Sequence, residues 1–532
     1  MNNYQSFLKN ELDKNAKHRN KLYCRDYLFT NASNISYECY PFYGRWVLNR
    51  IGNYTLATHP LAHVFVRIRN NYQIALVGHA LNPFTGEIDE NRILDHMLDA
   101  LQNGQEAFLD ELDQLTGVFV LFIVVGDSFQ AVQDCGGQKM LYFGEINHHI
   151  VVSSAPQLAG DVFSLAVDPQ VLRLLDSKGY YRGSGFLPGN LSPFKELKRL
   201  GPNTSVVYQN GSFSIGRVFP RHERRCLSND AEKQRLIQII HEIFQQNIAL
   251  SMKKWDRVSL SLTGGIDSQT TFANAKPWWN DLFCFSFISK PSEKDDAEAA
   301  SEICSKLGVI HHMYYIPQSP AEIEDYDLLS KIIEQNTSNT CKINPNEKRK
   351  YIWLERQNDF DVELKSDMSE VGRAYTERKY KGVRIPQKMK PRHLTINQAR
   401  YFMEPWCMRF ADKAYRSFME ETGLTGDILG YSMHDLVSWE VRMGAWASTS
   451  FSSQEYIHEI TIPYNNRLLL EMFLRFPENE RKLDLPHKML MASGSKELAD
   501  MQVRVKDSYL GSKRMLAETL YYYYATRLNL IR

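Results

Sequence analysis

The sequence predicts an α+β domain followed by an α/β domain that is built on a parallel sheet. Residues 35–215 contain many short β-type runs that are separated by turn residues, among them 72–83, 117–137 and 149–155. From residue 231 onward the pattern changes to alternating helices and strands, which is typical of parallel sheets. The predicted fold class is therefore α/β plus α+β.

The first domain is predicted to span residues 35–217, after an N-terminal helical extension over 1–34. Apolar residues recur at helical spacing over 93–112, which predicts one of its few helices. The tetrapeptide QNGS at 209–212 has the chemistry of a β-hairpin turn. Strands with a few helices favour a layered α+β arrangement.

Residues 218–230 are polar and basic and are interpreted as a linker to a second domain over 231–532. That domain begins with a helix over 231–252 and continues with strands that begin near 258, 281 and 309. A helix over 293–308 is expected to end at Gly308. The remainder, from about 320 to 532, is predicted to be mostly helical.

Composition excludes several classes of function. The formal net charge is +1, so no global field attracts nucleic acid or a membrane surface. The most apolar run, 118–125, is far too short to cross a bilayer. The 8 cysteines form no C-x-x-C pair, and together with a polar N-terminus this favours a cytoplasmic protein with reduced thiols.

The stretch SLSLTGGIDSQTT at 259–271 carries the clearest chemical signal. A strand ends in Gly264 and Gly265, which let the backbone turn tightly and approach a ligand. A helix starts directly afterwards, so its N–H groups offer an anion site. Asp267 adds a carboxylate, and a carboxylate beside phosphates usually indicates a bridging Mg²⁺. The loop therefore predicts binding of a polyphosphate with a metal.

This loop is neither a P-loop nor a dinucleotide fingerprint, because it lacks both glycine patterns. LTGGIDS at 262–268 instead resembles the pyrophosphate loop of the asparagine synthetase-like ATP pyrophosphatases, with Thr263 in place of the usual leading serine. The segments that begin at Asp295, Ser366, His458 and Val503 resemble further family motifs, in the expected order. The resemblance implies an adenine nucleotide α-hydrolase-like (PP-loop) domain with a helical C-terminal part.

Residues 112–144 resemble the glutaminase domain of the same family, which is an Ntn-hydrolase sandwich. Working glutaminases use an N-terminal cysteine, whereas here Met1 is followed by Asn2 and the nearest cysteines are Cys24 and Cys39. The segment expected to read Asn-Gly-Glu reads Val-Gly-His at 77–79. We therefore expect an inactive glutaminase domain, as in β-lactam synthetase and lasso-peptide cyclase.

The resemblance implies that a carboxylate attacks the α-phosphate of ATP, that pyrophosphate leaves, and that an amine then displaces AMP. Asp267 and Asp367 would hold Mg²⁺, and Lys506 would contact the α-phosphate. Glu370 is the first candidate for the base that deprotonates the amine, and Glu440 the second. The residues expected to bind ATP are Ser261, Thr263, Gly264, Gly265, Ile266, Asp267, Ser268 and Ser286.

The leading hypothesis is an ATP-dependent, AMP-forming amide-bond synthetase without glutaminase activity. Its carboxylate could belong to a small molecule, a sugar acid or a peptide, and its amine could be ammonia or a larger amine. Two alternatives stay open, a glutamine-dependent asparagine synthetase and a non-catalytic ATP-binding scaffold. A homodimer or a partner protein also stays open. For Glu440 an ion pair with Arg442 or another basic group is an equally good interpretation.

Overall fold

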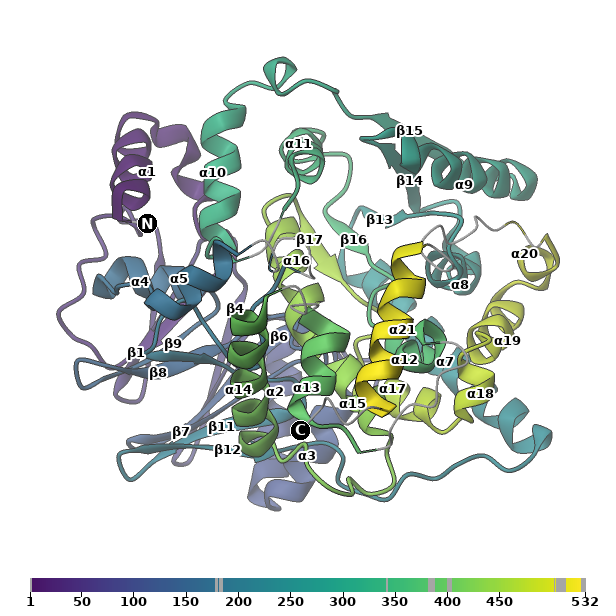
Figure 1. Ribbon diagram of the computed structural model, residues 1–532, viewed down its shortest axis with the longest axis horizontal. Helices are drawn as coiled ribbons and strands as arrows, with labels where there is room; N and C mark the ends of the chain where they lie inside the picture. The colour runs from purple at the N-terminus through teal and green to yellow at the C-terminus, as the bar shows by residue number, and fades with distance from the viewer. Residues whose placement is uncertain are drawn as a thin grey trace.

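The computed structural model describes residues 2–177, 180, 185–340, 343–380, 388–399, 404–501, 503 and 513–527. Two stacked antiparallel sheets from the first half of the chain lie on one side of the molecule (Figure 1). A parallel sheet with its helices lies on the other side.

The two antiparallel sheets each have six strands within the described residues. The first has the order β10-β8-β9-β1-β3-β2, and the second has the order β12-β11-β7-β6-β5-β4. The strands of the first sheet are β1 Tyr27–Thr30, β2 Val47–Ile51, β3 Tyr54–Thr58, β8 Tyr142–Ile146, β9 His149–Ser153 and β10 Leu197–Arg199. The strands of the second sheet are β4 Val64–Arg69, β5 Tyr72–Leu81, β6 Thr116–Val125, β7 Ser128–Gln133, β11 Thr204–Gln209 and β12 Ser212–Arg217.

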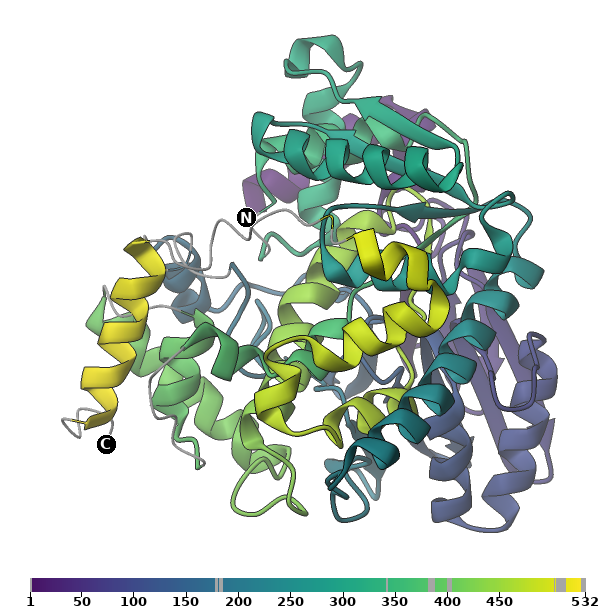
Figure 2. The same cartoon turned by 90° about the vertical axis from the view of Figure 1, so that its right-hand side faces the viewer.

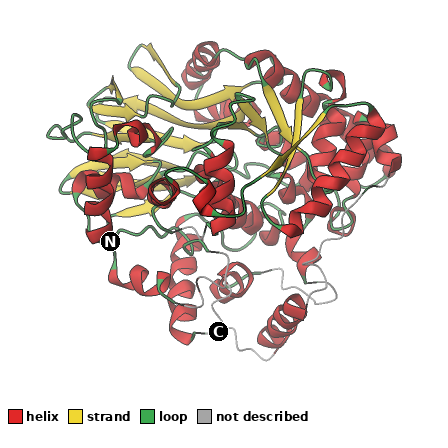
Figure 3. Cartoon of the chain, turned by 90° about the horizontal axis from the view of Figure 1, so that it is seen from above, coloured by secondary structure: helices red, strands yellow, loops and turns green. Residues whose placement is uncertain are grey.

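A shared hydrophobic core joins these two sheets face to face. Phe29 of the first sheet stacks on Phe122 of the second, with ring centroids 4.5 Å apart. Helices α2 (Glu90–Gln102) and α3 (Gln105–Gln114) cover the outer face of the second sheet, while α4 (Pro156–Phe163) packs against the first. The prediction of a layered α+β domain is confirmed by this arrangement, and Figure 3 shows its strands from above.

The second half of the chain contains a parallel sheet with the order β15-β14-β13-β16-β17. All of its strand pairs are parallel, which confirms the predicted α/β class. Its strands are β13 Val258–Ser261, β14 Phe283–Ile288, β15 His311–Tyr315, β16 Val362–Leu364 and β17 Glu459–Thr461. Figure 2 shows helix α9 lying across this sheet.

From about residue 320 onward the described residues are mostly helical, as predicted. The other α-helices within the described residues are α1 Asn2–Lys14, α5 Pro169–Leu175, α7 Asp230–Lys254, α8 Ile266–Asn274, α9 Lys294–Leu307, α10 Tyr326–Asn336, α11 Pro345–Leu354, α12 Tyr375–Lys379, α13 Pro391–Leu394, α14 Pro405–Glu421, α15 Met433–Val437, α16 Ser448–Gln454, α17 Arg467–Leu474, α18 Glu478–Arg481, α19 Leu485–Gly494, α20 Lys496–Met501 and α21 Lys513–Arg527. Between α15 and α16 the chain forms a wide π-helical segment, Ser438–Ala447. Within the described residues, no helix has the length and apolar composition needed to cross a membrane.

Local signals in the sequence place several boundaries correctly. Asn229 caps α7 by accepting the backbone N–H of Glu232. Gly308 ends α9 with a left-handed backbone, φ +70°. The hairpin turn joins β11 to β12, and Asn210 and Gly211 both have the positive φ that such a turn requires.

Two expectations differ from the structure. The extension over 1–34 is helical only in its first part, because Tyr27–Thr30 forms strand β1 inside the first sheet. All four residues of this strand are buried, so it belongs to the core of the first domain. In the second half, β16 and β17 complete the parallel sheet although each has three residues, too few to show a strand period.

The two halves of the chain share an extensive polar interface. Asn466 donates to the backbone oxygen of Gln114, and Arg467 pairs with Asp113 at 2.8 Å. Glu459 of β17 accepts from Trp255 and pairs with His79 at 3.1 Å. The side chains of Asp113, His79, Asn466 and Arg467 are buried, and each is hydrogen-bonded or ion-paired across the boundary, so the two halves form one packed unit.

His63 gives this interface a pH dependence. Its Nε2 lies 3.3 Å from Glu459 Oε2, and this hydrogen bond raises the pKa of His63 above its usual value. A raised pKa in the folded state stabilises the fold below the unfolded pKa of about 6.5, and the contribution is lost as pH rises through the raised value. At pH 5.5 we expect the free energy of unfolding of wild type to exceed that of His63→Gln by less than about 1 kcal/mol, because His63 is largely exposed. The difference should vanish by about pH 9. Urea unfolding at both pH values checks this, and a difference that grows with pH would contradict it.

Candidate active site

The predicted phosphate loop lies at the carboxyl end of strand β13. Strand β13 ends at Ser261, and α8 begins at Ile266 with Gly265 as its N-terminal cap. Strand β13 is the middle strand of the sheet, between β14 and β16. The carboxyl edge of a parallel sheet is where open α/β folds bind ligands, so the loop stands in the expected place.

Internal hydrogen bonds fix the shape of this loop. The backbone N–H of Thr263 donates to Ser268 Oγ at 3.1 Å, and that of Gly265 donates to Thr263 Oγ1 at 3.1 Å. Gln269 Nε2 donates to the backbone oxygen of Gly264 at 3.0 Å. These hydrogen bonds within the chain hold the strand–loop–helix turn in one shape.

Ser286 supports the loop from behind. Its buried hydroxyl donates to the backbone oxygen of Leu262 at 2.6 Å and lies 2.9 Å from His311 Nε2. The structure thus assigns Ser286 a supporting position for the loop. Ser261, Ile266 and the other predicted residues of 261–268 do lie together on this one turn.

Asp267 is held in place by two partners. Ser369 Oγ donates to Asp267 Oδ1 at 2.7 Å, and Arg373 Nη1 pairs with Oδ2 at 2.6 Å. Arg373 also pairs with Asp484, at 2.8 Å, and Arg378 pairs with Asp484 at 3.0 Å. Asp267 is therefore one end of a chain of alternating charges, and part of its side chain stays exposed.

The acidic segment at 366–370 lies beside Asp267, as the motif order predicts. The pKa of Asp367 is raised to about 6, mainly by burial; the charge of Lys365 acts to lower it, and the charges of Glu370 and Asp267 act to raise it. Burial also acts to raise the pKa of Glu370, but the charge and hydrogen bond of Arg442 hold it below its usual value. Glu370 is therefore ionised at neutral pH.

Arg442 is a site residue that the motifs did not indicate. Its Nε donates to Glu370 Oε2 at 2.8 Å, and its guanidinium lies over the rings of Tyr375 and Trp446. Aromatic faces on the guanidinium fix its direction toward Glu370. Arg373 and Ser369 were likewise missed, although both stand within or next to the acidic motif. Arg373 follows Glu370 at the i, i+3 spacing at which side chains of a helix are neighbours, and this spacing could have indicated that Arg373 pairs with an acidic group.

Glu440 does not occupy the catalytic position predicted for it. Its side chain is 0 % exposed, and both oxygens pair with Arg217, at 2.6 and 3.1 Å. Asn203 Nδ2 donates to the same carboxylate at 3.4 Å. Because both oxygens are engaged with the first domain, Glu440 is a structural ion-pair partner. This confirms the alternative interpretation, an ion pair with another basic group, and corrects the assignment of Glu440 as a base.

Lys506 lies outside the described residues. The described lysine beside Asp367 is Lys365, whose Nζ lies 2.6 Å from Glu363 Oε1 and whose charge lowers the pKa of Asp367. Glu363 also pairs with His458 at 2.7 Å. Glu363, in β16, therefore holds the positive charge of Lys365 close to the carboxylate of Asp367.

His487 packs behind Asp267 with unused polar atoms. It is 0 % exposed, both ring nitrogens lack a hydrogen-bond partner in the described structure, and its ring stacks on Phe473 at 4.9 Å. Burial lowers the pKa of His487 to about 4, so the ring is neutral. An unsatisfied buried polar atom costs roughly 1–3 kcal/mol.

His487→Phe is therefore expected to raise the free energy of unfolding by about 1 kcal/mol, because it keeps the stacking and removes both unpaired nitrogens. The matched control is His458→Phe, which removes a hydrogen-bonded buried histidine and should destabilise the protein. Urea unfolding of both variants checks the prediction. Destabilisation by His487→Phe would show that this ring has a partner that satisfies it.

Residues 240–344 match the family model described as asparagine synthase, a segment that contains the phosphate loop. No curated protein sequence matches the chain significantly. One similar solved structure is the allosteric regulatory enzyme of purine biosynthesis, at 10% identity over 62% of this chain and 89% of that one, with a TM-score of 0.26. Another is glutamine phosphoribosylpyrophosphate amidotransferase from B. subtilis, complexed with ADP and GMP, at 11% identity over 69% and 73%, with a TM-score of 0.23. Scores this low carry no conclusion. The asparagine synthase match covers the phosphate loop but not the acidic segment at 366–370, and it supports an asparagine synthetase-like family for this chain.

Proposed function

We propose that the chain is an ATP-dependent, AMP-forming amide-bond synthetase. The observation that carries this proposal is the loop at 262–268, which presents the N-terminus of α8 at the carboxyl edge of the sheet with Asp267 and Asp367 close by. Helix N-termini of this kind bind phosphate groups. The family match implies amide-bond synthesis with ATP.

The donor atoms suit Mg²⁺ bound together with phosphates. Within the described residues, no three acidic, histidine or cysteine side chains form a metal cluster. Mg²⁺ commonly uses one or two carboxylates and takes its other ligands from phosphates and water. Asp267 and Asp367 provide this pair, and the bound ion would neutralise charge on the leaving pyrophosphate.

The backbone and side chains around the loop would bind the pyrophosphate, orient Asp267 and accept a proton. The backbone of 263–268 would cradle the pyrophosphate, and Arg373 would hold Asp267 in place. Glu370 is ionised and would accept the proton of the attacking amine, with Arg442 fixing its direction. Lys506 stays a proposal for the α-phosphate contact.

We also propose that the amine does not come from glutamine hydrolysis in the first domain. His79, the last residue of the Val-Gly-His segment that stands where Asn-Gly-Glu is expected, is buried and pairs with Glu459 of the second half. The thiol of Cys24 is buried, and burial raises its pKa, which disfavours the nucleophilic thiolate. Ammonia or another amine would then be the donor.

The test is nucleotide product analysis with a carboxylate panel of amino acids, uronic acid derivatives and short peptides. We expect AMP and pyrophosphate in equal amounts, with ammonium or a simple amine as co-substrate. Glutamine without ammonium should give no glutamate. Formation of ADP and phosphate, or glutamate release that depends on the first domain, would contradict the proposal.

A further inference from the structure

A tight turn of the first domain, residues Asp134–Lys139, reaches into the second half of the chain. The carboxylate of Asp134 accepts backbone N–H groups from Phe119, Gly136, Gln138 and Lys139, at 2.9 to 3.2 Å. The turn is buried, so these hydrogen bonds are shielded from water. Asp134 therefore makes the turn a rigid object.

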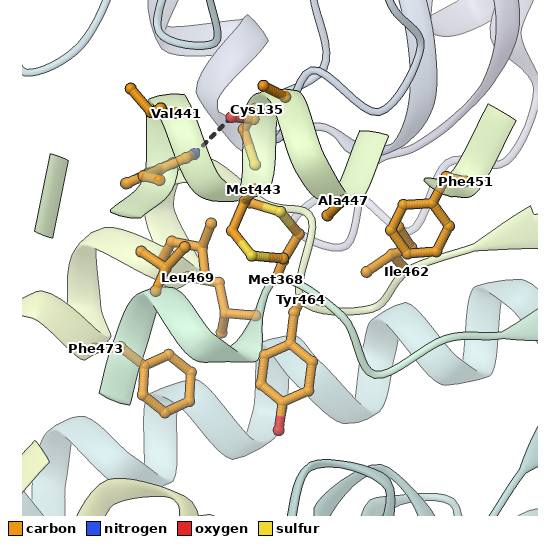
Figure 4. Close-up of a cluster of buried hydrophobic side chains, with 14 of the residues drawn as sticks. Cys135, Met368, Val441, Met443, Ala447, Phe451, Ile462, Tyr464, Leu469 and Phe473 are labelled. Carbon is orange, nitrogen blue, oxygen red and sulfur yellow. Dashed lines mark hydrogen bonds between the residues drawn. The ribbon is translucent and has the colours of Figure 1, made fainter. Parts of the chain in front are cut away.

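The second half of the chain holds this turn from two sides. Asn465 Nδ2 donates to Asp134 Oδ1 at 2.9 Å, and Cys135 Sγ lies 3.1 Å from Asn465 Oδ1. Trp439 Nε1 donates to the backbone oxygen of Cys135 at 2.7 Å, the dashed contact in Figure 4. The position of the turn is thus fixed relative to both β17 and the π-helical segment.

The tip of the turn contacts the acidic motif directly. Gln138 Nε2 lies 3.4 Å from Met368 Sδ, and a Cβ added at Gly136 would stand 2.7 Å from the same sulfur. Met368 is 0 % exposed and lies at the centre of the cluster in Figure 4, beside Met443 and Tyr464. The close approach explains why position 136 has no side chain.

Met368 has a left-handed backbone, φ +70°, which is unfavourable for a residue with a side chain. Its neighbours on either side are Asp367 and Ser369, and Ser369 Oγ donates to Asp267. A change in the backbone at Met368 would therefore move the carboxylate of Asp367 and the Ser369 hydroxyl that holds Asp267. Packing around the side chain has to hold this conformation in place.

We propose that the Asp134–Lys139 turn is a positioning element of the second domain: it holds Met368 in its left-handed conformation and so sets the direction of Asp367 and Ser369. This rests on the proposed function, in which Asp267 and Asp367 bind Mg²⁺ with ATP. The first domain is then a working part of the synthetase site, whether or not it hydrolyses glutamine.

The test compares binding of MgATP with binding of metal-free ATP by calorimetry on the full chain, so no acceptor is needed. Met368→Gly removes the contact with the turn and frees the backbone. We expect the Kd of MgATP to rise about 10-fold, as for residues that orient metal ligands, while the Kd of metal-free ATP stays within about 2-fold. Gly136→Ala, which crowds the same contact from the other side, should give the same pattern.

Two controls separate positioning from general loss of structure. Met368→Leu keeps the packing and should bind MgATP within about 3-fold of wild type. Met97→Ala removes a buried methionine of α2 that belongs to a different hydrophobic cluster from Met368, and it should lower stability without changing either Kd. Circular dichroism checks that each variant is folded. If Met368→Gly does not fold, the nucleotide affinities of Gly136→Ala test the positioning role.

Wild-type affinity for MgATP in both Met368→Gly and Gly136→Ala would overturn the inference and leave the proposed function intact. Equal weakening of MgATP and metal-free ATP would also overturn it, because the turn would then act on the whole nucleotide site. Failure of wild type to bind MgATP would instead remove the proposed function, and the positioning role with it.

Discussion

Asp267→Asn is expected to lower ATP–pyrophosphate exchange at least about 100-fold, the order found when one charge-stabilising group is removed from an active site. The amide keeps the size of the side chain and its hydrogen bond with Ser369. It removes the negative charge that would hold Mg²⁺ and that pairs with Arg373. Radiolabelled pyrophosphate exchange into ATP measures the effect.

The matched control is Asp484→Asn, because Asp484 is the other carboxylate that pairs with Arg373. Asp484 lies on the far side of Arg373 from the phosphate loop, so we expect the exchange rate of Asp484→Asn to fall less than about 10-fold. Equal losses in the two variants would show that Asp267 acts through Arg373. Wild-type exchange in Asp267→Asn would contradict its assignment as a metal ligand.

Glu440→Ala is expected to lower the free energy of unfolding by about 3–5 kcal/mol, because it leaves the largely buried guanidinium of Arg217 without its partner. Glu440 lies in the π-helical segment and Arg217 ends β12, so the loss falls on the interface between the two halves. Urea unfolding followed by circular dichroism measures it.

The double variant Arg217→Met with Glu440→Leu should recover much of this stability, since apolar pairs often replace buried ion pairs without loss. Exchange activity per folded molecule should stay near the wild-type value in Glu440→Gln. A variant with unchanged stability and no activity would restore Glu440 as a catalytic base.

Local chemistry explains which features could be predicted from the sequence. The phosphate loop, the hairpin at 209–212 and the ends of α7 and α9 depend on residues close together in the chain, such as Asn229 and Gly308. The glycines and capping residues at these places favour one backbone conformation, so the local sequence indicates these turns and helix ends directly. The family motifs also keep the order that brings Asp267 and Asp367 together.

Features that depend on distant partners could not be predicted. Glu440 and Arg217 are separated by 223 residues, and the sequence does not show that they meet. The same holds for the contact of Gln138 with Met368, which are 230 residues apart. The three-residue strands β16 and β17 depend on their neighbours for hydrogen bonds and burial, because β16 pairs with β13 and β17 pairs with β16. Tertiary context decides each of these.

The most direct test of the account is ATP–pyrophosphate exchange with Mg²⁺ across aspartate, uronic acid derivatives and short peptides. The account predicts exchange with one class of carboxylate, loss of that exchange in Asp267→Asn, and no requirement for glutamine. Exchange with none of these classes by a protein that binds MgATP tightly would contradict adenylation and favour the ATP-binding scaffold.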